Sequence, residues 1–435
     1  MGKPRVLVVG TGFAGYHCLR TLERVLPPDA AELVAVNPTD YMLYVPLLPE
    51  VAGGSLDPRR VAVPLRPKLP RTRLVQGNAT TIDLGARTCA VVDVEGREQV
   101  LEWDRLVLTA GSVTRLLSIP GVAEHAFGFK SVAEAVFLRD HVLRQVELAE
   151  QADDPAERAA RATFVVVGAG YTGTELVAQV QQLTRSALRG RTGLTEADLR
   201  WVLVDTAPRV LPGLDERLSG PAARVLRARG VDLRLKTSVE SVTATCARLT
   251  DGTEIPTRTL VWCVGVRPDP LVESVAVKTE EGRVVVDPTL AVPTHPHVFA
   301  AGDVAAVPDV FNDNRPTPMT AQHAQRQGKL AGRNVAASLG RGAVGTYRHR
   351  DLGFVVDLAG AQAVANPLHV PLTGLPAKAV ARGYHLLAMP GNRLRVAVDW
   401  LTDLLARRQV VQFGLVPEAG VRLSDAEQVP TIKRS

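Results

Sequence analysis

Two glycine-rich turns are the first candidates for chemistry in this chain. One lies in RVLVVGTGFAGYH, residues 5–17, and the other in FVVVGAGYTGTEL, residues 164–176. Each follows a valine-rich run and leads into a segment of helical character, the context in which G-x-G-x-x-G binds a pyrophosphate. The glycines permit a tight bend and close packing, and the free N–H groups at the start of the helix attract phosphate. Two copies predict two dinucleotides, or one long resident cofactor and one mobile one.

The residue that ends the second strand of such a unit normally contacts the adenosine ribose. In the second unit this residue is Asp205, in WVLVDTAPR. A carboxylate accepts hydrogen bonds from a ribose 2′-hydroxyl and repels a 2′-phosphate, so Asp205 favours NADH over NADPH. Asn37 stands at the equivalent position of the first unit and can bond a ribose without charge.

Two further carboxylates have both a structural and a chemical interpretation. Glu175 completes the capping-box pattern of residues 172–175, in which a glutamate bonds the backbone at the start of its own helix. Asp303 follows the apolar run HVFAAGDVA, and a buried aspartate there needs a hydroxyl or amide partner. The alternative is that Asp303 caps the next helix.

Length and composition limit the classes of protein. A chain of 435 residues is long enough for two or three domains. Its four cysteines are scattered without a C-x-x-C pair, so we predict neither a redox-active disulfide nor a metal site. The formal net charge of +6 is compatible with cofactor phosphates or an anionic lipid surface, and no nucleic-acid partner is predicted. No apolar run reaches membrane-spanning length and no signal peptide is expected, which favours an intracellular protein.

The elements that must position the turns form a repeated plan. Residues 5–37 read as strand, turn, helix and strand of a parallel sheet. Residues 72–84 and 88–96 alternate in polarity and predict a small appended sheet. A helix over about residues 132–149 and a solvated connection at residues 150–161 lead to the second unit, which repeats the plan.

The last part of the chain contains an amphipathic segment over residues 378–416. Leu394, Ala397, Leu401 and Leu404/Leu405 recur at helical spacing. Trp400 lies beside them, and the flanking arginines are Arg393, Arg395, Arg407 and Arg408. A basic helix with an apolar face and a tryptophan suits the surface of an anionic membrane. The alternative is that this face packs on the protein itself or on a second subunit.

Taken together, the motifs resemble those of the type II NADH dehydrogenases, single-chain FAD-dependent NADH:quinone oxidoreductases of the pyridine nucleotide-disulfide oxidoreductase superfamily. The resemblance extends over most of the chain. The stretches that carry it include GTGFAG, DYMLYVPLLPEVAGG, LTAGS, GAGYTGTEL, VDTAPRVLPGLDERLS, VWCVGVRPDP, VFAAGDVA, TAQHAQRQGKLAGRNVAA and RGYHLLAMPGNRLRVAVDW. It implies an α/β fold with two Rossmann-like domains of the glutathione-reductase type and a C-terminal membrane-associating segment. It also implies a homodimer, peripheral on the cytoplasmic face of the cell membrane, that reduces a membrane quinone without pumping protons.

The resemblance also implies domain boundaries. These are residues 1–120 for the first part of the FAD-binding domain, 121–160 for a connecting helix and linker, 161–285 for the NADH-binding domain, 286–350 for the second part of the FAD-binding domain, and 351–435 for a C-terminal domain with the amphipathic tail.

The same resemblance assigns residues to three sites. FAD would be bound by Gly10, Gly12, Phe13, Ala14, Gly15, Asn37, Ala79, Ala110, Gly111, Gly302 and Asp303. NADH, the substrate, would be bound by Gly168, Gly170, Tyr171, Gly173, Asp205, Val264 and Gly265. The quinone would contact Pro46, Leu47, Gln322 and Arg326. Glu175 would serve quinone reduction, in which two protons accompany two electrons.

Other acceptors stay open on the sequence. Because there is no C-x-x-C pair, the reduced flavin of such a protein must pass its electrons to something that docks against it. That acceptor is a quinone in the leading hypothesis, and an iron–sulfur protein or oxygen in the alternative. A nucleotide-sensing flavoprotein with little turnover is a third hypothesis.

Overall fold

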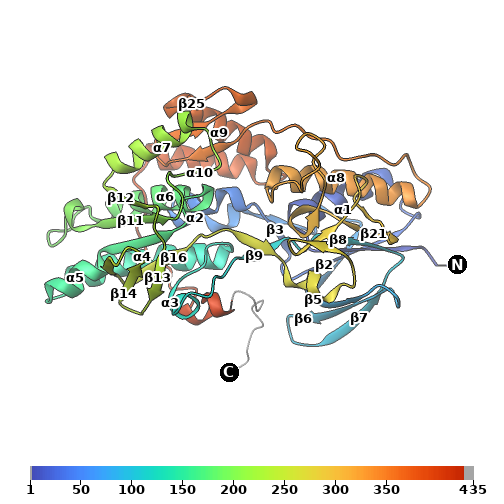
Figure 1. Cartoon of the computed structure of the whole chain (residues 1–435), viewed down its shortest axis with the longest axis horizontal. Helices are drawn as coiled ribbons and strands as arrows, with labels where there is room; N and C mark the ends of the chain where they lie inside the picture. The colour runs from blue at the N-terminus through green and yellow to red at the C-terminus, as the bar shows by residue number, and fades with distance from the viewer. Residues whose placement is uncertain (1, 426–435) are drawn as a thin grey trace.

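The computed structural model describes residues 2–425 and contains two main sheets side by side, a larger mixed sheet with a parallel centre and a smaller parallel one (Figure 1). The larger sheet has the strand order β20-β21-β8-β1-β2-β5-β6-β7. In chain order its strands are β1 Arg5–Val9, β2 Glu32–Asn37, β5 Thr72–Asp83, β6 Thr88–Asp93, β7 Glu98–Glu102, β8 Arg105–Leu108, β20 Ala291–Val292 and β21 His295–Ala300. The sheet therefore joins strands from the first 110 residues to two strands near residue 300.

Close helix packing covers the larger sheet. The valine-rich run of β1 is buried from Val6 to Val9, as a strand covered on both faces requires. Helix α1 (Phe13–Val25) follows and packs on α8 (Ala321–Ser338). A Cβ atom on Gly328 of α8 would lie only 2.1 Å from the carbonyl oxygen of Ala14. Glycine thus lets the two helices approach backbone to backbone.

One expectation for this region is wrong in part. Strand β5 pairs in parallel with β2 through residues 72–76 and then in antiparallel with β6 through residues 77–83. The predicted appended sheet is therefore an extension of the main sheet, because a single long strand belongs to both. Alternating polarity alone does not reveal how far a strand continues.

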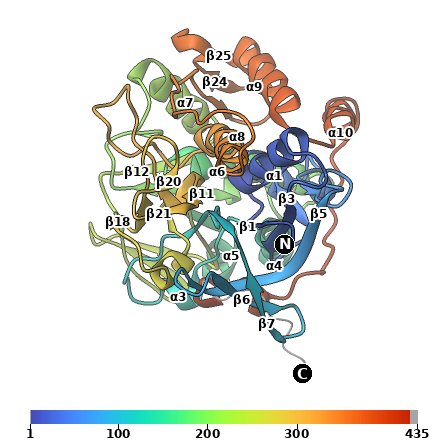
Figure 2. The same cartoon turned by 90° about the vertical axis from the view of Figure 1, so that its right-hand side faces the viewer.

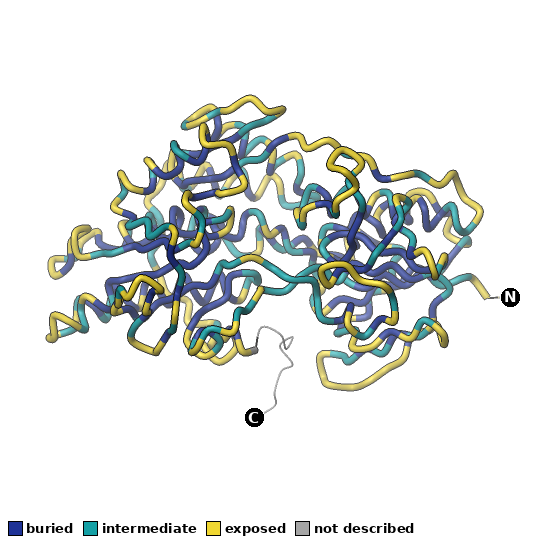
Figure 3. Tube along the Cα trace, viewed as in Figure 1, coloured by how far each residue is buried: buried dark blue, intermediate teal, exposed yellow. Residues whose placement is uncertain are grey.

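The second sheet repeats the plan with the order β12-β11-β10-β16. Its strands are β10 Thr163–Val167, β11 Arg200–Asp205, β12 Val231–Leu235 and β16 Thr259–Trp262, and they are covered by α4 Val132–Gln151, α6 Tyr171–Ala187 and α7 Glu216–Ala228. The expected solvated connection contains a short helix, α5 Pro155–Arg161, which Asp154 caps by accepting a hydrogen bond from the Ala156 N–H at 3.0 Å. Figure 3 shows the buried residues concentrated in the two sheets and their covering helices.

The C-terminal part adds a small antiparallel sheet and two helices at the periphery (Figure 2), and the sheet packs against α6 and α7. The elements are β23 Val355–Asp357, β24 Ala363–Ala365, β25 Leu372–Thr373, α9 Gly374–Ala388 and α10 Arg393–Leu405. Trp400 of α10 is 4% exposed and donates its indole N–H to Glu50, so the expected interfacial role of Trp400 is wrong. The end of the predicted tail domain, residues 426–435, lies outside the described residues.

Along residues 2–425, none of the helices combines the length and the apolar character needed to cross a bilayer.

Candidate active site

The three glycines of the first turn have two different roles: two are required by the backbone geometry, and one borders open space. Gly10 has a φ of +88°, and a Cβ atom on Gly15 would lie 1.9 Å from the Gly10 carbonyl oxygen. These two glycines therefore make the bend and the close helix–strand contact possible. A Cβ atom on Gly12, in contrast, would meet nothing within 4 Å. Gly12 thus borders the open space in which a phosphate can approach the start of α1.

The second turn has the same geometry. Gly168 has a φ of +103°, and a Cβ atom there would lie 2.3 Å from the carbonyl oxygen of Cys263. A Cβ atom on Gly173 would lie 1.9 Å from the Gly168 carbonyl oxygen, whereas one on Gly170 would meet nothing within 4 Å. The first N–H groups of α1 and α6 have no partner within their helices, which suits both turns to a pyrophosphate.

The two residues expected at the ribose also brace the turns. The Asn37 Oδ1 atom accepts a hydrogen bond from the Thr11 N–H at 2.9 Å. The Asp205 Oδ2 atom accepts one from the Ala169 N–H at 2.5 Å, and Oδ1 accepts another from Ala207 at 2.7 Å. The sequence interpretation missed this task, which holds the turn in place before any ligand binds. The ribose contact itself stays a prediction.

Several other expected FAD residues lie at the carboxyl ends of the strands. Ala110 and Gly111 follow β8, and Gly302 follows β21. Gly302 has a φ of +80° and donates its N–H to the Gln327 side chain at 2.8 Å. A Cβ atom on Gly302 would lie 3.1 Å from the Cβ atom of Ala14. The loop after β21 is thereby held against the start of α1.

Two expected FAD residues lie in different settings. The Phe13 ring lies 5.6 Å from the Tyr44 ring, centroid to centroid. Ala79 lies within β5, where the pairing with β6 shifts register. Phe13 is the first residue of α1. Ala79 lies in the part of β5 that pairs with β6.

Asp303 has a protein partner rather than a helix to cap. It lies inside a 3-10 turn, Gly302–Val304, and makes no side-chain cap, so the capping alternative is wrong. Its Oδ2 atom accepts a hydrogen bond from the Ser112 hydroxyl at 2.6 Å, and Lys130 Nζ donates to the same hydroxyl at 2.7 Å. Burial lowers the pKa of Lys130, while the nearby Asp303 carboxylate opposes that shift. The sequence interpretation missed Ser112 and Lys130.

The predicted acceptor residues come from two places. Pro46 and Leu47 lie in the 3-10 turn Val45–Leu47, where Leu47 is buried and Pro46 is half-buried. Gln322 on α8 donates to the Gly353 carbonyl oxygen at 2.7 Å, and Arg326 donates to the carbonyl oxygen of Gln322 at 3.0 Å.

The start of α6 meets the same C-terminal segment. The Tyr171 ring lies 5.9 Å from the ring of Phe354, the residue after Gly353. Val264 and Gly265 follow β16, where the Gly265 carbonyl oxygen accepts a hydrogen bond from the Arg115 N–H at 3.1 Å. The segment that contains Phe354 therefore links the first turns of α6 and α8.

Glu175 bonds a distant strand rather than its own helix. Helix α6 begins after Gly170 and has no side-chain cap, so the capping-box interpretation is wrong. The Glu175 Oε1 atom accepts a hydrogen bond from the backbone N–H of Asp357 at 2.8 Å. Loss of water around the half-buried side chain raises the pKa of Glu175 well above its ordinary value, against the opposing effect of the Asp357 N–H.

A buried polar cluster that the sequence interpretation missed surrounds this carboxyl group. Asp357 and Lys378 form a buried ion pair, and Gln179 donates to Asp357 Oδ1 at 3.3 Å. Glu50 is 4% exposed and accepts a hydrogen bond from the Trp400 indole N–H at 2.5 Å. Burial raises the pKa of Glu50 to about 7, and the Asp357 carboxylate adds to that shift. Its place in the acceptor loop YVPLLPEV was the one available signal.

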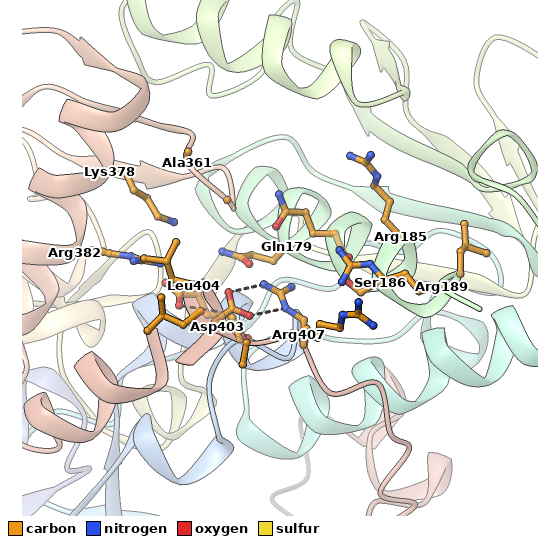
Figure 4. A pocket seen from close by; sticks show the side chains of 18 of the residues that line it. Gln179, Arg185, Ser186, Arg189, Ala361, Lys378, Arg382, Asp403, Leu404 and Arg407 are labelled. Carbon is orange, nitrogen blue, oxygen red and sulfur yellow. Dashed lines mark hydrogen bonds and ion pairs between the residues drawn. The ribbon is translucent and has the colours of Figure 1, made fainter. Parts of the chain in front are cut away.

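A cavity of about 960 Å³ connects this cluster with the surface. Its lining includes Glu50, Gln179 and Lys378 of the cluster. Arginines from α6, α9 and the segment after α10 also line it, among them Arg185, Arg382 and Arg407 (Figure 4). Among them, Arg408 forms an ion pair with Asp403 at 2.8 Å. The cavity offers water and protons a polar route toward the carboxyl groups.

The raised pKa of Glu50 predicts that the difference in stability between wild type and Glu50→Gln depends on pH. A carboxyl group whose pKa is raised on folding stabilises the protein below its unfolded pKa and loses that contribution as the pH rises through the folded value. We therefore expect Glu50→Gln, which can still accept from Trp400, to match wild type near pH 4 and to be more stable by about 3 kcal/mol near pH 8.5. Urea unfolding at the two pH values measures the difference. An equal difference at both values would contradict the prediction.

Comparisons with known proteins agree with this geometry. The family described as pyridine nucleotide-disulphide oxidoreductase matches residues 4–328. The type II NADH:quinone oxidoreductase Ndh of Mycobacterium tuberculosis (strain ATCC 25618 / H37Rv) is 31% identical over 94% of this chain and 89% of its own length. That of Staphylococcus aureus (strain MSSA476) is 27% identical over 86% of this chain and 92% of its own length.

A solved structure gives the same fold. NDH2 from Plasmodium falciparum, in complex with NADH, superposes with a TM-score of 0.86 over 94% of this chain and 100% of that chain, at 15% identity. The expected α/β fold with two dinucleotide-binding units is therefore confirmed. The chain belongs to the pyridine nucleotide-disulphide oxidoreductase family and, within it, to the type II NADH:quinone oxidoreductases.

Proposed function

We propose that this chain is an enzyme that oxidises NADH and delivers two electrons to a membrane quinone, with FAD as its resident cofactor and without pumping protons. The observation that carries the proposal is the pair of equivalent glycine turns, in which Gly12 and Gly170 face open space. The M. tuberculosis relative, which this chain matches along 94% of its length, is named for the same activity.

The residues of the first turn fit FAD. Gly12 leaves room for a pyrophosphate beside the free N–H groups at the start of α1. FAD would be held by Gly10, Gly12, Phe13, Ala14 and Gly15, with Asn37, Ala79, Ala110, Gly111, Gly302 and Asp303 along the rest of the cofactor. Bound FAD supplies the two-electron chemistry that amino-acid side chains lack. Ser112 and Lys130 hold the Asp303 carboxylate in one orientation.

The residues of the second turn fit NADH. Gly168, Gly170, Tyr171 and Gly173 would contact its phosphates, and Val264 and Gly265 would border the nicotinamide. Asp205 would accept from the ribose 2′-hydroxyl, since a single carboxylate can hold the Ala169 N–H and a hydroxyl together. Its negative charge disfavours the extra phosphate of NADPH.

The cysteines of this chain do not supply an internal electron acceptor. Within the described residues all four are unpaired. Cys263 is next to the proposed nicotinamide position, but desolvation raises the pKa of its thiol to about 12, so it stays protonated and unreactive. Electrons must therefore leave to an acceptor that docks near Pro46, Leu47, Gln322 and Arg326.

Glu175 is proposed to supply protons for quinone reduction. Its raised pKa favours the protonated form of the carboxyl group, and the Asp357 N–H fixes its Oε1 atom. Glu50 and Lys378 line the 960 Å³ cavity, and Lys378 is paired with Asp357, whose N–H bonds Glu175; this connection supports proton replacement from the solvent side.

A half-reaction experiment tests the proposed function. The purified protein is expected to be yellow, to lose flavin absorbance on addition of NADH, and to regain it on addition of a short-chain quinone. Because of Asp205, NADPH is expected to act at least tenfold more slowly. Stopped-flow absorbance measures each step. A colourless protein that does not take up FAD would contradict the proposal, and an equal rate with NADPH would contradict the role of Asp205.

Peripheral attachment to an anionic lipid surface is part of the same proposal. The apolar residues of α10 point outward: Leu394 is 77% exposed, Leu401 54%, Leu404 73% and Leu405 76%. They do not pack on the protein itself, and a basic helix with such a face binds membrane interfaces. The cytoplasmic face and the homodimer stay predictions from the family.

A further inference from the structure

A basic pocket lies at the N-terminal end of the exposed apolar stripe of α10. Its volume is about 680 Å³, and its walls come from α1, α8 and the turn between α9 and α10. We call it the α1–α8 pocket. It is separate from the two glycine turns, because it uses the second half of α1 and the middle of α8.

Positive side chains outnumber carboxylates in this pocket and form no ion pairs within the described part of the chain. Four of them are Arg20 and Arg24 from α1 and Lys329 and Arg333 from α8. None of the four forms an ion pair anywhere in residues 2–425. Burial lowers the pKa of Lys329, and neighbouring arginines including Arg20, Arg24 and Arg333 lower it further. An anion placed between these groups would relieve their mutual repulsion.

The wall of the pocket also holds polar groups that suit a phosphate. His17 is 6% exposed, and its Nε2 atom has no hydrogen-bond partner. Burial lowers the pKa of His17 to about 3, so the neutral ring can donate one hydrogen bond to an oxygen atom. The carboxylate on the wall, Glu23, already accepts hydrogen bonds from the Arg71 N–H at 2.9 Å and the Thr72 hydroxyl at 2.8 Å. Both bonds end on its Oε1 atom, and its single negative charge is outnumbered by the five basic side chains of the lining, Arg20, Arg24, Lys329, Arg333 and Arg393.

The rim of the pocket is apolar and continuous with the stripe of α10. Leu387, at the end of α9, lines the pocket and is 77% exposed. Leu394, Val398, Leu401 and Leu405 follow on one face of α10, at i, i+4, i+7 and i+11. A ligand that fills both parts needs an anionic group joined to long apolar chains.

We propose that the α1–α8 pocket binds the phosphate group of an anionic phospholipid, with the acyl chains beside Leu387 and the apolar stripe. This inference rests on the proposed membrane attachment and names the lipid chemistry that it recognises. Gln325 and Lys329 in the pocket wall lie within one turn of Gln322 and Arg326, the proposed acceptor residues. A lipid bound here would therefore turn the acceptor side of the protein toward the membrane in which a quinone dissolves.

A double substitution with a charge-matched control tests the proposal. Arg20→Gln/Lys329→Gln removes two charges from the pocket. Arg87→Gln/Lys278→Gln removes two exposed charges from the β5–β6 turn and the segment before β18 (Thr279–Glu280). Flotation is measured with phosphatidylcholine vesicles, with and without phosphatidylglycerol, at an ionic strength of about 0.15 M. We expect the pocket variant to bind phosphatidylglycerol vesicles about tenfold more weakly than wild type, and the control variant to bind like wild type.

Each other outcome has a defined meaning. Equal losses in both double variants would overturn the proposal, because diffuse surface charge would then explain the binding. Thermal stabilisation of wild type by inorganic phosphate, without a flotation difference, would assign the pocket to a free anion and also overturn it. Turnover of NADH with a soluble quinone is expected to be the same in all three proteins. If the wild-type protein showed no turnover, the enzyme proposal would be contradicted, but the flotation result would still test lipid binding.

Discussion

Glu175→Gln is expected to slow quinone reduction about a hundredfold and to leave the reduction of the bound flavin by NADH unchanged. Glutamine keeps the size of the side chain and can still accept from the Asp357 N–H, which Glu175 Oε1 bonds at 2.8 Å. It cannot release or take up a proton. Because general acid catalysis contributes about 10²–10⁴ in rate, the loss falls on the half-reaction that consumes protons.

The two half-reactions and their pH dependence separate this role from a structural one. Stopped-flow measurements follow flavin reduction by NADH and its reoxidation by a short-chain quinone. Since the pKa of Glu175 is raised, the wild-type reoxidation rate is expected to fall as the pH rises through that value, whereas the variant should show no such fall. Glu124→Gln, at an exposed position of α3 (Val122–His125), is the control. Wild-type quinone turnover in Glu175→Gln would exclude the proton role.

Both glycine turns could be predicted from the sequence because each is a local feature. The valine run, the glycine spacing and the following helix lie within about a dozen residues, and each part favours the next. The helix α10 was predictable for the same reason, from leucines at helical spacing. Asn37 and Asp205 were found as strand ends, but the hydrogen bonds by which they brace the turns require coordinates.

The cluster around Glu175 could not be predicted, because its partners are remote in the chain. Glu50 and Trp400 are 350 residues apart, and Glu175 and Asp357 are 182 apart. Asp357 ends β23, a strand of three residues that is too short to show an alternation. The amphipathic pattern placed Trp400 on the lipid side, which is wrong. Helical spacing alone does not tell whether a residue at the edge of the apolar face contacts the protein or the lipid.

Gly170→Val and Gly173→Val are expected to fail in different ways. Gly170 has an extended conformation, with φ of −71° and ψ of −165°, and a Cβ atom there meets nothing. Gly170→Val should therefore fold normally and bind FAD, but the reduction of its flavin by NADH should be at least about a hundredfold slower, because the side chain occupies the phosphate space. Gly173→Val places its Cβ atom 1.9 Å from the Gly168 carbonyl oxygen, so α6 must move from β10. Its free energy of unfolding should fall by about 3 kcal/mol.

Thermal unfolding, flavin absorbance and stopped-flow reduction distinguish these outcomes, and Gly12→Val extends the test to the first turn. A Cβ atom on Gly12 also meets nothing, so that variant should fold but lose its yellow colour. The pattern is specific: one open glycine controls FAD content, the other controls NADH reactivity, and the enclosed glycine controls stability. If Gly170→Val were reduced by NADH at the wild-type rate, the dinucleotide phosphates would have to lie elsewhere, because no side chain can share that space with them.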